Sequence, residues 1–274
     1  AFRNENGLIV DESDKWYRDA AIYDLFSQAE DPQNICFDVI KSLIAEKEII
    51  NPIDLAMGTG RMIWQIMDKL FFKGVLLGID ASDQMCEYVS TAIRRGRKFT
   101  YNVKIIQSTI ADAPKNISDK SSFIISSFGF PSRITDTVLC LKELKAVHEL
   151  LSDDGIFLTI GWDETFNDEL NEMWFKHIPD SICASSFEEW RQIRLSSILS
   201  PRNCSLTWYK KGILVPLQFS SLEQSAVVMG YLFGRDAAQY IINTKKTEWL
   251  MSLGITLNSK KEIKEIINAY EKRN

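Results

Sequence analysis

The stretch that decides the fold is Ile53-Asp54-Leu55-Ala56-Met57-Gly58-Thr59-Gly60-Arg61. A short apolar run of strand length enters a glycine turn, and the apolar residues over 62–72 have helical spacing. Glycines suit such a turn because a side chain at Gly58 or Gly60 would hold the backbone away from a ligand, and because tight turns often need positive φ. The stretch therefore predicts a strand, a turn and a helix that together bind a nucleotide.

Two common nucleotide motifs do not fit this turn. A dinucleotide fingerprint, G-x-G-x-x-G, would place its last glycine at position 63, where the chain has Ile63. No Gly-Lys-Ser/Thr follows the turn either, which argues against a phosphate-binding P-loop. The sequence thus favours another nucleotide ligand, with a purely structural strand-to-helix turn as the alternative.

The segment from Asp54 to Gly60 resembles the first motif of class I S-adenosylmethionine-dependent methyltransferases, roughly acidic-x-x-x-Gly-x-Gly. Residues 74–80 read as the next strand, and Asp80 at its end suits a ribose diol, because a carboxylate accepts hydrogen bonds from both hydroxyls. The resemblance implies S-adenosyl-L-methionine as cofactor, with S-adenosyl-L-homocysteine as product. It also implies an α/β fold, a Rossmann-like seven-stranded sheet with helices on both faces, here with an added helical cap.

The resemblance implies a set of cofactor-binding residues. Met85 would pack against the adenine, although methionine at that spacing also suits a plain core position. The family usually has an Asp for the adenine amino group where this chain has Thr109; we expect the Thr109 hydroxyl and the Ile110 backbone to serve, in preference to Asp112. The full set is Asp54, Ala56, Gly58, Gly60, Asp80, Ala81, Met85, Thr109, Ile110, Ser127, Tyr17 and Tyr23. The two tyrosines would lie either in a lid over the cofactor or simply against the core.

The acceptor class follows from charge and from the fourth strand. The chain has 274 residues, 25% of them charged, and a net charge of −5, which argues against a broad nucleic-acid footprint. That strand ends in Ser127-Phe128-Gly129-Phe130, unlike the [Asp/Asn/Ser]-Pro-Pro-aromatic motif of enzymes that methylate amines of DNA bases, and no Pro-Cys occurs. DNA is therefore an unlikely substrate, and a small-molecule acceptor is expected.

The cysteines, histidines and apolar runs of the sequence indicate where the protein is located and whether it binds a metal. Five cysteines, an odd number without C-x-x-C, read as reduced thiols, and with two histidines they form no zinc set of the usual spacing. No apolar stretch approaches the roughly 18 residues of a membrane span. We expect a soluble cytoplasmic protein without a metal or a membrane segment; the oligomeric state is not readable.

The chain is expected to form one domain, 1–274. Its parts are an N-terminal helical lid (1–50), a cofactor-binding core (51–162), a cap insertion (163–203), and closing strands with C-terminal helices (204–274). In the last part, 205–219 predicts two strands joined at 210–212, followed by helices over 221–233, 236–242, 246–253 and 259–272. Ligands of parallel sheets sit at the carboxyl ends of the strands, where Asp54–Gly60, Asp80, Thr109, Ser127 and Trp162 all fall.

Methyl transfer is an in-line displacement that depends mainly on positioning. A general base is needed only for a protonated acceptor; His177 is the candidate imidazole, with Asp163 and Glu164 as rivals. Phe130, Trp162 and Trp174 are candidate substrate residues, as a stacking wall or a cation-attracting face, or else part of the core of the cap. Two other functions stay open: a tRNA or protein methyltransferase, and a catalytically silent cofactor-binding or partner subunit.

Overall fold

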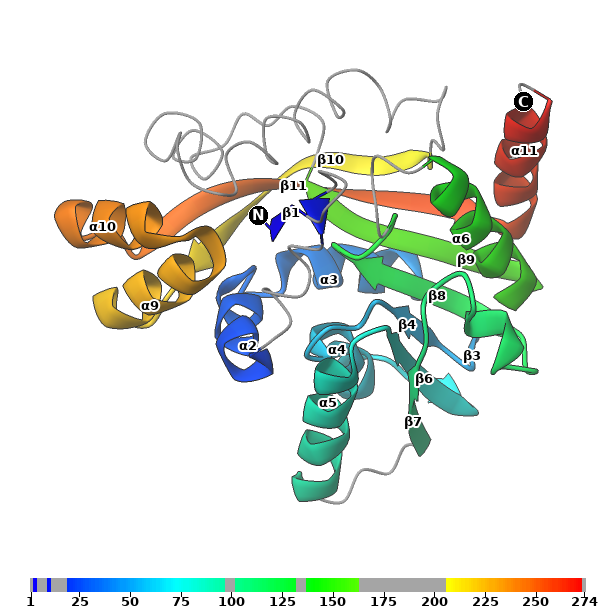
Figure 1. Ribbon diagram of the computed structural model, residues 1–274. Helices are drawn as coiled ribbons and strands as arrows, with labels where there is room; N and C mark the ends of the chain where they lie inside the picture. The colour runs from blue at the N-terminus through cyan, green and yellow to red at the C-terminus, as the bar shows by residue number, and fades with distance from the viewer. Residues whose placement is uncertain are drawn as a thin grey trace.

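The computed structural model describes residues 2–3, 9–10, 19–96, 102–131, 137–162 and 206–272. One large twisted sheet runs through this part of the chain, with helices on both of its faces (Figure 1). Two small pairs accompany it: β1 (Phe2–Arg3) with β2 (Ile9–Val10), and β3 (Ile49–Ile50) with β5 (Phe72–Lys73).

The large sheet has seven strands in the order β10-β11-β9-β8-β4-β6-β7. Every pair from β9 to β7 is parallel, and β11 runs antiparallel to both of its neighbours. The α/β sheet expected from the sequence is thereby confirmed. The strands are β4 (Ile53–Leu55), β6 (Val75–Asp80), β7 (Asn102–Gln107), β8 (Ser121–Ser127), β9 (Leu151–Trp162), β10 (Trp208–Gln218) and β11 (Glu248–Ser259).

Strand side chains alternate between two hydrophobic cores, one on each face of the sheet. In β8, Phe123 and Ile125 enter one core while Ile124 enters the other, as the two-residue period of a strand requires. Ile53 and Leu55 of β4 belong to the second core, so the intervening Asp54 side chain lies on the first. The central strand therefore presents a carboxylate to a face that is otherwise apolar.

Helices cover both cores. The first core includes residues of α2 (Ala20–Ala29), α3 (Ile35–Leu43), α4 (Arg61–Lys69), α5 (Asp83–Arg95), α9 (Leu222–Phe233) and α10 (Arg235–Thr244). The second includes residues of the short helix η1 (Ala113–Lys115), α6 (Thr137–Leu150) and α11 (Lys260–Glu271). The Ser82 side chain caps α5 by accepting from the Met85 N–H at 3.3 Å.

Two expectations for the C-terminal part are wrong. Residues 210–212 do not join two strands, because β10 continues through them with register shifts on either side of Lys210, and Gly212 has φ +67° within this irregular stretch. Glycine and polar residues signal a bulge as readily as a hairpin turn. Residues 246–253 do not form a helix but begin β11, in which Trp249 and Met251 are fully buried while Leu250 is 42% exposed.

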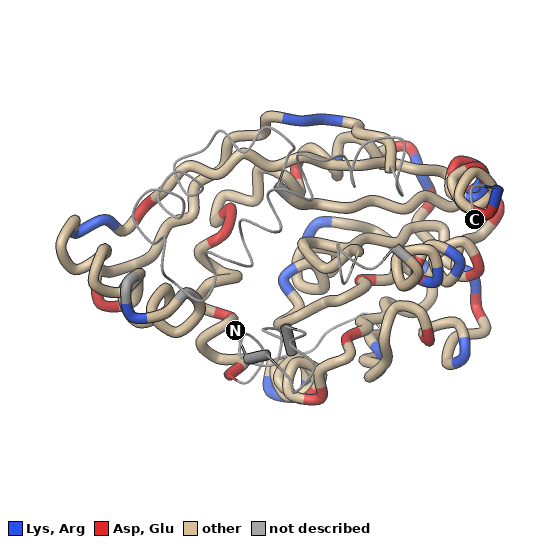
Figure 2. The backbone as a smooth tube through the Cα atoms, turned by 45° about the horizontal axis from the view of Figure 1, so that its top comes forward, with Lys and Arg blue, Asp and Glu red and all other residues tan. Residues whose placement is uncertain are grey.

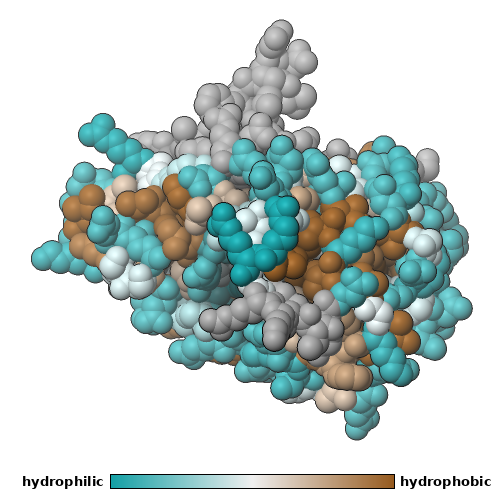
Figure 3. Space-filling model, turned by 90° about the horizontal axis from the view of Figure 1, so that it is seen from below, coloured by the Kyte–Doolittle hydropathy of each residue, from teal (hydrophilic) through white to brown (hydrophobic). Residues whose placement is uncertain are grey.

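The surface mixes both signs of charge. Lys and Arg positions are interspersed with Asp and Glu positions along the described chain (Figure 2). Hydrophobic side chains lie in both halves of the face shown in Figure 3, including the side where α9 and α10 lie. Val227 and Ile242 of these two helices are more than half exposed. Within the described ranges, no helix has the length and apolar content needed to span a bilayer.

Candidate functional site

The glycine turn between β4 and α4 forms the floor of the site. Ala56, Gly58 and Gly60 have φ of +53°, +54° and +85°, in the left-handed region where glycine is favoured. A Cβ added at Gly58 would lie 3.3 Å from the Tyr23 ring, and one at Gly60 would lie 3.1 Å from Val89 Cγ2. Both glycines are therefore needed, for backbone conformation and for the close approach of α2 and α5.

Asp54, at the centre of β4, is a buried acid of the site. It is 1% exposed, and neither carboxylate oxygen has a hydrogen-bond partner. Burial raises its pKa well above the ordinary value, and the charge of Asp80 adds to this. The guanidinium of Arg61 opposes the rise, as does the nearby backbone N–H of Ile63, which makes no hydrogen bond of ordinary geometry to either oxygen. A buried carboxyl without a partner costs stability, so its presence beside a pocket points to a ligand.

Asp80 ties the glycine turn to the end of β6. Its Oδ2 accepts from the Gly58 N–H at 2.9 Å, and its Oδ1 accepts from the Ser82 N–H at 2.9 Å. Burial raises the pKa of Asp80, and these backbone N–H groups oppose the rise. Each oxygen has a second lone pair, so the carboxylate can still accept bonds from a ligand diol.

A pocket opens beside Asp54, where the N-terminal helix α2 meets the glycine turn, α4 and the end of β8. Its lining combines charged, hydroxyl and aromatic groups rather than apolar ones alone. The lining residues are Tyr23, Ser27, Glu30, Asp54, Ala56, Met57, Gly58, Arg61, Met62, Ser127 and Phe128.

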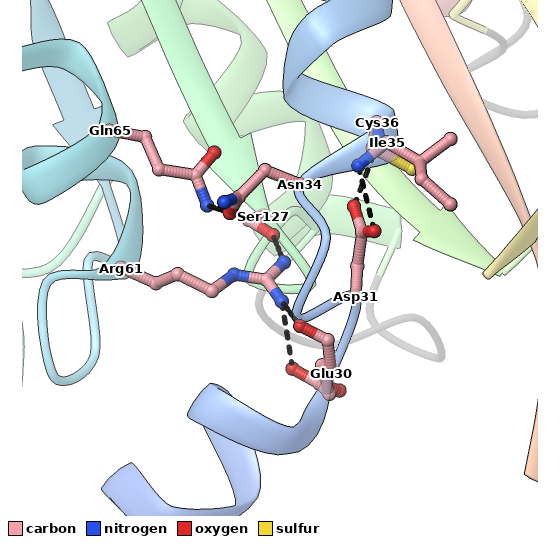
Figure 4. A network of polar contacts seen from close by, with 8 residues as sticks. All are labelled: Glu30, Asp31, Asn34, Ile35, Cys36, Arg61, Gln65 and Ser127. Atoms are coloured by element: carbon pink, nitrogen blue, oxygen red, sulfur yellow. Dashed lines mark hydrogen bonds and ion pairs between the residues drawn. The ribbon is translucent and has the colours of Figure 1, made fainter. Parts of the chain in front are cut away.

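Arg61, the first residue of α4, links this helix to Glu30 after α2 and to Ser127 at the end of β8 (Figure 4). Its Nη1 donates to the Glu30 backbone oxygen at 2.8 Å and lies 3.7 Å from Glu30 Oε2, while its Nη2 donates to Ser127 Oγ at 3.2 Å. Burial raises the pKa of Glu30 to about 7, with Arg61 opposing the rise and Asp31 adding to it. A neutral and an ionised Glu30 are therefore both populated near neutral pH.

The neighbouring acid, Asp31, has a structural role. Its carboxylate oxygens accept from the N–H groups of Ile35 at 2.8 Å and Cys36 at 2.9 Å, at the start of α3 (Figure 4). Its own N–H donates to the Pro216 oxygen at 2.9 Å, and Glu30 forms an isolated bridge with Leu217. The turn that carries Glu30 is thus held against β10.

The residues predicted to hold the adenine lie beyond the ends of β6 and β7. The Thr109 hydroxyl donates to Asp112 Oδ2 at 2.9 Å and accepts from the Asp112 N–H at 3.2 Å, so the two alternative adenine partners are joined to each other. Ile110 and Met85 are buried, and Ala81 is exposed. The adenine contacts stay a prediction.

The other predicted residues are divided between this pocket, the core and the part that is not described. Phe130 packs edge to face on Phe157, with ring centroids 5.1 Å apart, and does not line the pocket. Trp162 ends β9, and its side chain lies outside what the structure describes. Also outside the described residues are Tyr17, Asp163, Glu164, Trp174 and His177.

Sequence reasoning missed Glu30, Ser27 and Arg61, which line the pocket with Asp54. Arg61 had a visible signal, because it directly follows Gly60 at the start of a predicted helix. Glu30 had none: it directly follows a helix, and only the fold brings it to Arg61. Among the described residues, no group of three or more His, Cys, Asp or Glu side chains is arranged to hold a metal ion.

A family described as "methyltransferase domain" matches residues 46–204, more than half of the chain. The chain therefore belongs to this methyltransferase family, and its sheet is the Rossmann-like α/β sheet of class I methyltransferases. A comparison with curated proteins gave no match.

Several solved structures are similar to this chain. An S-adenosylmethionine-dependent methyltransferase from Clostridium acetobutylicum is 23% identical with a TM-score of 0.43; the match covers 54% of this chain and 61% of that one. The plantazolicin methyltransferase BamL, solved with a substrate analogue and SAH, is 15% identical with a TM-score of 0.49 over 89% and 94% of the two chains. The N-methyltransferase NodS from Bradyrhizobium japonicum is 10% identical with a TM-score of 0.44, over 81% and 93%.

Proposed function

We propose that this protein transfers the methyl group of S-adenosyl-L-methionine to an oxygen or nitrogen atom of a small-molecule acceptor. The observation that carries the proposal is Asp54, a buried carboxyl without a partner, beside a glycine turn inside the segment that matches the methyltransferase family. A cationic ligand group near Asp54 would supply the missing partner.

The residues present fit this cofactor. Asp80 offers lone pairs to a ribose diol, and the glycine turn lets a ligand approach the backbone. When bound, the cofactor supplies a methyl group on a positively charged sulfur, and the protein holds acceptor and methyl in line. Asp54 and Glu30 offer carboxyl oxygens to a cationic ligand group, and the charge of such a group would oppose the rise in pKa that burial causes. A base is needed only for a protonated acceptor, and His177, Asp163 and Glu164 remain the proposed candidates.

A small-molecule acceptor is favoured over tRNA because the charge is −5 and both signs are interspersed over the described surface (Figure 2). The test of acceptor class is transfer of labelled methyl groups from S-adenosyl-L-methionine in a cell extract, divided into small-molecule, RNA and protein fractions. We expect label in the small-molecule fraction. Label confined to RNA or protein would contradict the proposed acceptor class.

The first experiment is calorimetric titration of the protein with S-adenosyl-L-methionine and, separately, with NADH. We expect micromolar binding of the first and no heat from the second, because the dinucleotide motif is interrupted at Ile63. Binding of neither ligand would favour the catalytically silent alternative, whereas binding of NADH alone would contradict the cofactor.

A further inference from the structure

Phe128, the first residue after β8, has a backbone conformation that its side chain disfavours. Its φ is +60°, in the left-handed region, where a bulky residue other than glycine is an outlier. The other described non-glycine residues with positive φ are Asp31, Asn34, Asn51, Ala56 and Lys245. Asp and Asn tolerate this region, Ala56 is small, and Lys245 is the C-cap of α10. Among the described residues, only Phe128 has positive φ without such an explanation in its residue type or in a helix end.

The contacts of the chain around Phe128 hold this conformation in place. The Phe128 N–H donates to the Ile160 oxygen of β9 at 2.8 Å. At the next residue, Gly129, an added Cβ would lie 2.3 Å from the Cβ of Ala56, so the chain passes this point only with glycine. A strained backbone conformation persists where its surroundings impose it, and such positions gather at functional sites. The strain at Phe128 therefore indicates a function for its side chain.

The strand order places Phe128 on the opposite side of β4 from Asp80. β6, which ends at Asp80, lies on one side of β4, and β8 and then β9 lie on the other. A cofactor whose ribose is held by Asp80 lies on the β6 side, as the proposed function requires, and the side of β8 and β9 is left for the acceptor. There the half-buried Phe128 ring packs against the first core and lines the pocket together with Tyr23 of α2.

We propose that the Phe128 ring forms the acceptor-facing wall of the site, and that the acceptor carries a flat aromatic group beside the oxygen or nitrogen atom that takes the methyl group. The inference rests on the proposed function and names its substrate class. Aromatic rings attract each other in offset or edge-to-face arrangements, beyond the effect of the area they bury. A ring held in one orientation therefore favours flat acceptors over aliphatic ones. The rival interpretation is that Phe128 only packs against the first core.

The wild-type protein gives the first measurement. Labelled methyl groups are transferred from S-adenosyl-L-methionine to the small molecules of a cell extract, unreacted cofactor is removed, and the products are separated by reversed-phase chromatography with ultraviolet detection. We expect the label in products that absorb as aromatic compounds. Label only in aliphatic products, or no labelled small molecule from a protein that binds the cofactor, overturns the inference and leaves the cofactor intact. Failure to bind S-adenosyl-L-methionine overturns the proposed function together with the inference.

Three variants separate a role in acceptor binding from a role in packing. Phe128→Leu keeps an apolar side chain without a ring, so methyl transfer at limiting extract and saturating cofactor should fall roughly 2- to 10-fold, the range for one aromatic pair. Phe128→Tyr keeps the ring and should transfer as the wild type does. Phe71→Leu makes the same chemical change at a side chain that is 80% exposed, and should also behave as the wild type. Calorimetric affinity for S-adenosyl-L-methionine should be unchanged in all three.

The outcomes for these variants are distinct. Loss of transfer in Phe128→Leu, with unchanged cofactor affinity and with transfer kept in Phe128→Tyr, supports the inference. Equal transfer by Phe128→Leu and the wild type overturns it, as does an equal loss in Phe128→Leu and Phe128→Tyr. Parallel losses of transfer and cofactor affinity in Phe128→Leu would assign the ring to the fold or to the cofactor, and overturn the inference as well.

Discussion

Two regions of the same sheet bury polar groups in different ways. At the carboxyl ends of β4 and β6, the buried groups are ionisable: Glu30, Asp54 and Asp80 are each less than 9% exposed. Between β9 and β11 they are neutral, and the Thr159 and Thr256 hydroxyl oxygens lie 2.6 Å apart across the pair. Burying an ionisable group without a partner is far more costly than burying a hydroxyl that finds one, so Asp54 costs stability where the paired Thr159 and Thr256 hydroxyls do not.

The comparison teaches where this fold places its function. A buried acid without a partner is tolerated where a ligand supplies one, and such positions rarely coincide with the best-packed part of a protein. The β9–β11 region closes the sheet with Trp249, Met251 and Leu253 fully buried in the core. Replacing the unpartnered acid Asp54 should therefore stabilise the protein, whereas replacing a partnered group such as Asp80 or Thr159 should destabilise it.

The first expected effect is at Asp54, where stability and ligand affinity should change in opposite directions. Asp54→Asn removes a buried carboxyl whose pKa is raised by burial, and such a group costs stability at pH values above its ordinary pKa. The variant should therefore be more stable than the wild type at pH 8, while its S-adenosyl-L-methionine affinity should fall roughly 10- to 100-fold. Urea denaturation and calorimetry measure the two quantities. The exposed Asp154→Asn is the matched control and should change neither. A destabilised Asp54→Asn with normal binding would contradict the assignment of Asp54 to ligand binding.

The next effect is the pH dependence that Glu30 creates. Its folded-state pKa is raised from 4.5 to about 7, so the folded protein holds this proton more tightly than the unfolded chain. The resulting stability is present below pH 4.5 and is lost as the pH rises through 7. At about 1.36 kcal/mol per pH unit this amounts to about 3 kcal/mol.

Denaturation at pH 5.5 and 8.5 checks this contribution. The wild-type protein should lose folding free energy between these two pH values. In Glu30→Gln this loss should be smaller, because glutamine does not titrate. Glu46→Gln changes an exposed side chain of the same type and should keep the wild-type difference. Equal pH dependence of Glu30→Gln and wild type would show that Glu30 is not the titrating group.

Asp80 should respond with the opposite sign to Asp54. Asp80→Ala leaves the N–H groups of Gly58 and Ser82 without their acceptor, so stability should fall by about 1–2 kcal/mol. S-adenosyl-L-methionine affinity should fall by about 1.5–3 kcal/mol, the range for hydrogen bonds to a charged group. Asp80→Asn keeps one acceptor oxygen, so its stability and its affinity should lie between those of Asp80→Ala and the wild type. Near-normal calorimetric binding by a folded Asp80→Ala would refute the ribose role.

The smallest effect is expected in the neutral region. Thr159→Val leaves the Thr256 hydroxyl buried without its partner and should reduce the free energy of unfolding by about 1 kcal/mol. The double variant Thr159→Val, Thr256→Val removes both hydroxyls and should return close to wild-type stability. Additive losses in the double variant would show that each hydroxyl has a separate partner.

The sequence predicted the central sheet well because its signals are local. The run from Ile53 to Gly60 has strand length and a glycine turn, and the spacing after Asp83 is helical, so periods of two and 3.6 residues were enough. The errors fell where local signals are ambiguous. The residues around Gly212 fit a bulge as well as a turn, and the apolar run at Trp249 fits a strand or a helix until its neighbours β9 and β10 are known.

The sequence by itself determined the glycine turn at Gly58 and Gly60, Asp54 before it and Asp80 at the end of the next strand. These features depend on backbone conformation and strand ends, which are set by residues close together in the chain. Only the tertiary structure decided that Arg61 joins Glu30, 31 residues away, and Ser127, 66 residues away. It also decided that these groups surround an unpartnered Asp54. Burial and pKa depend on which elements pack together, and that information lies in long-range contacts that no local spacing records.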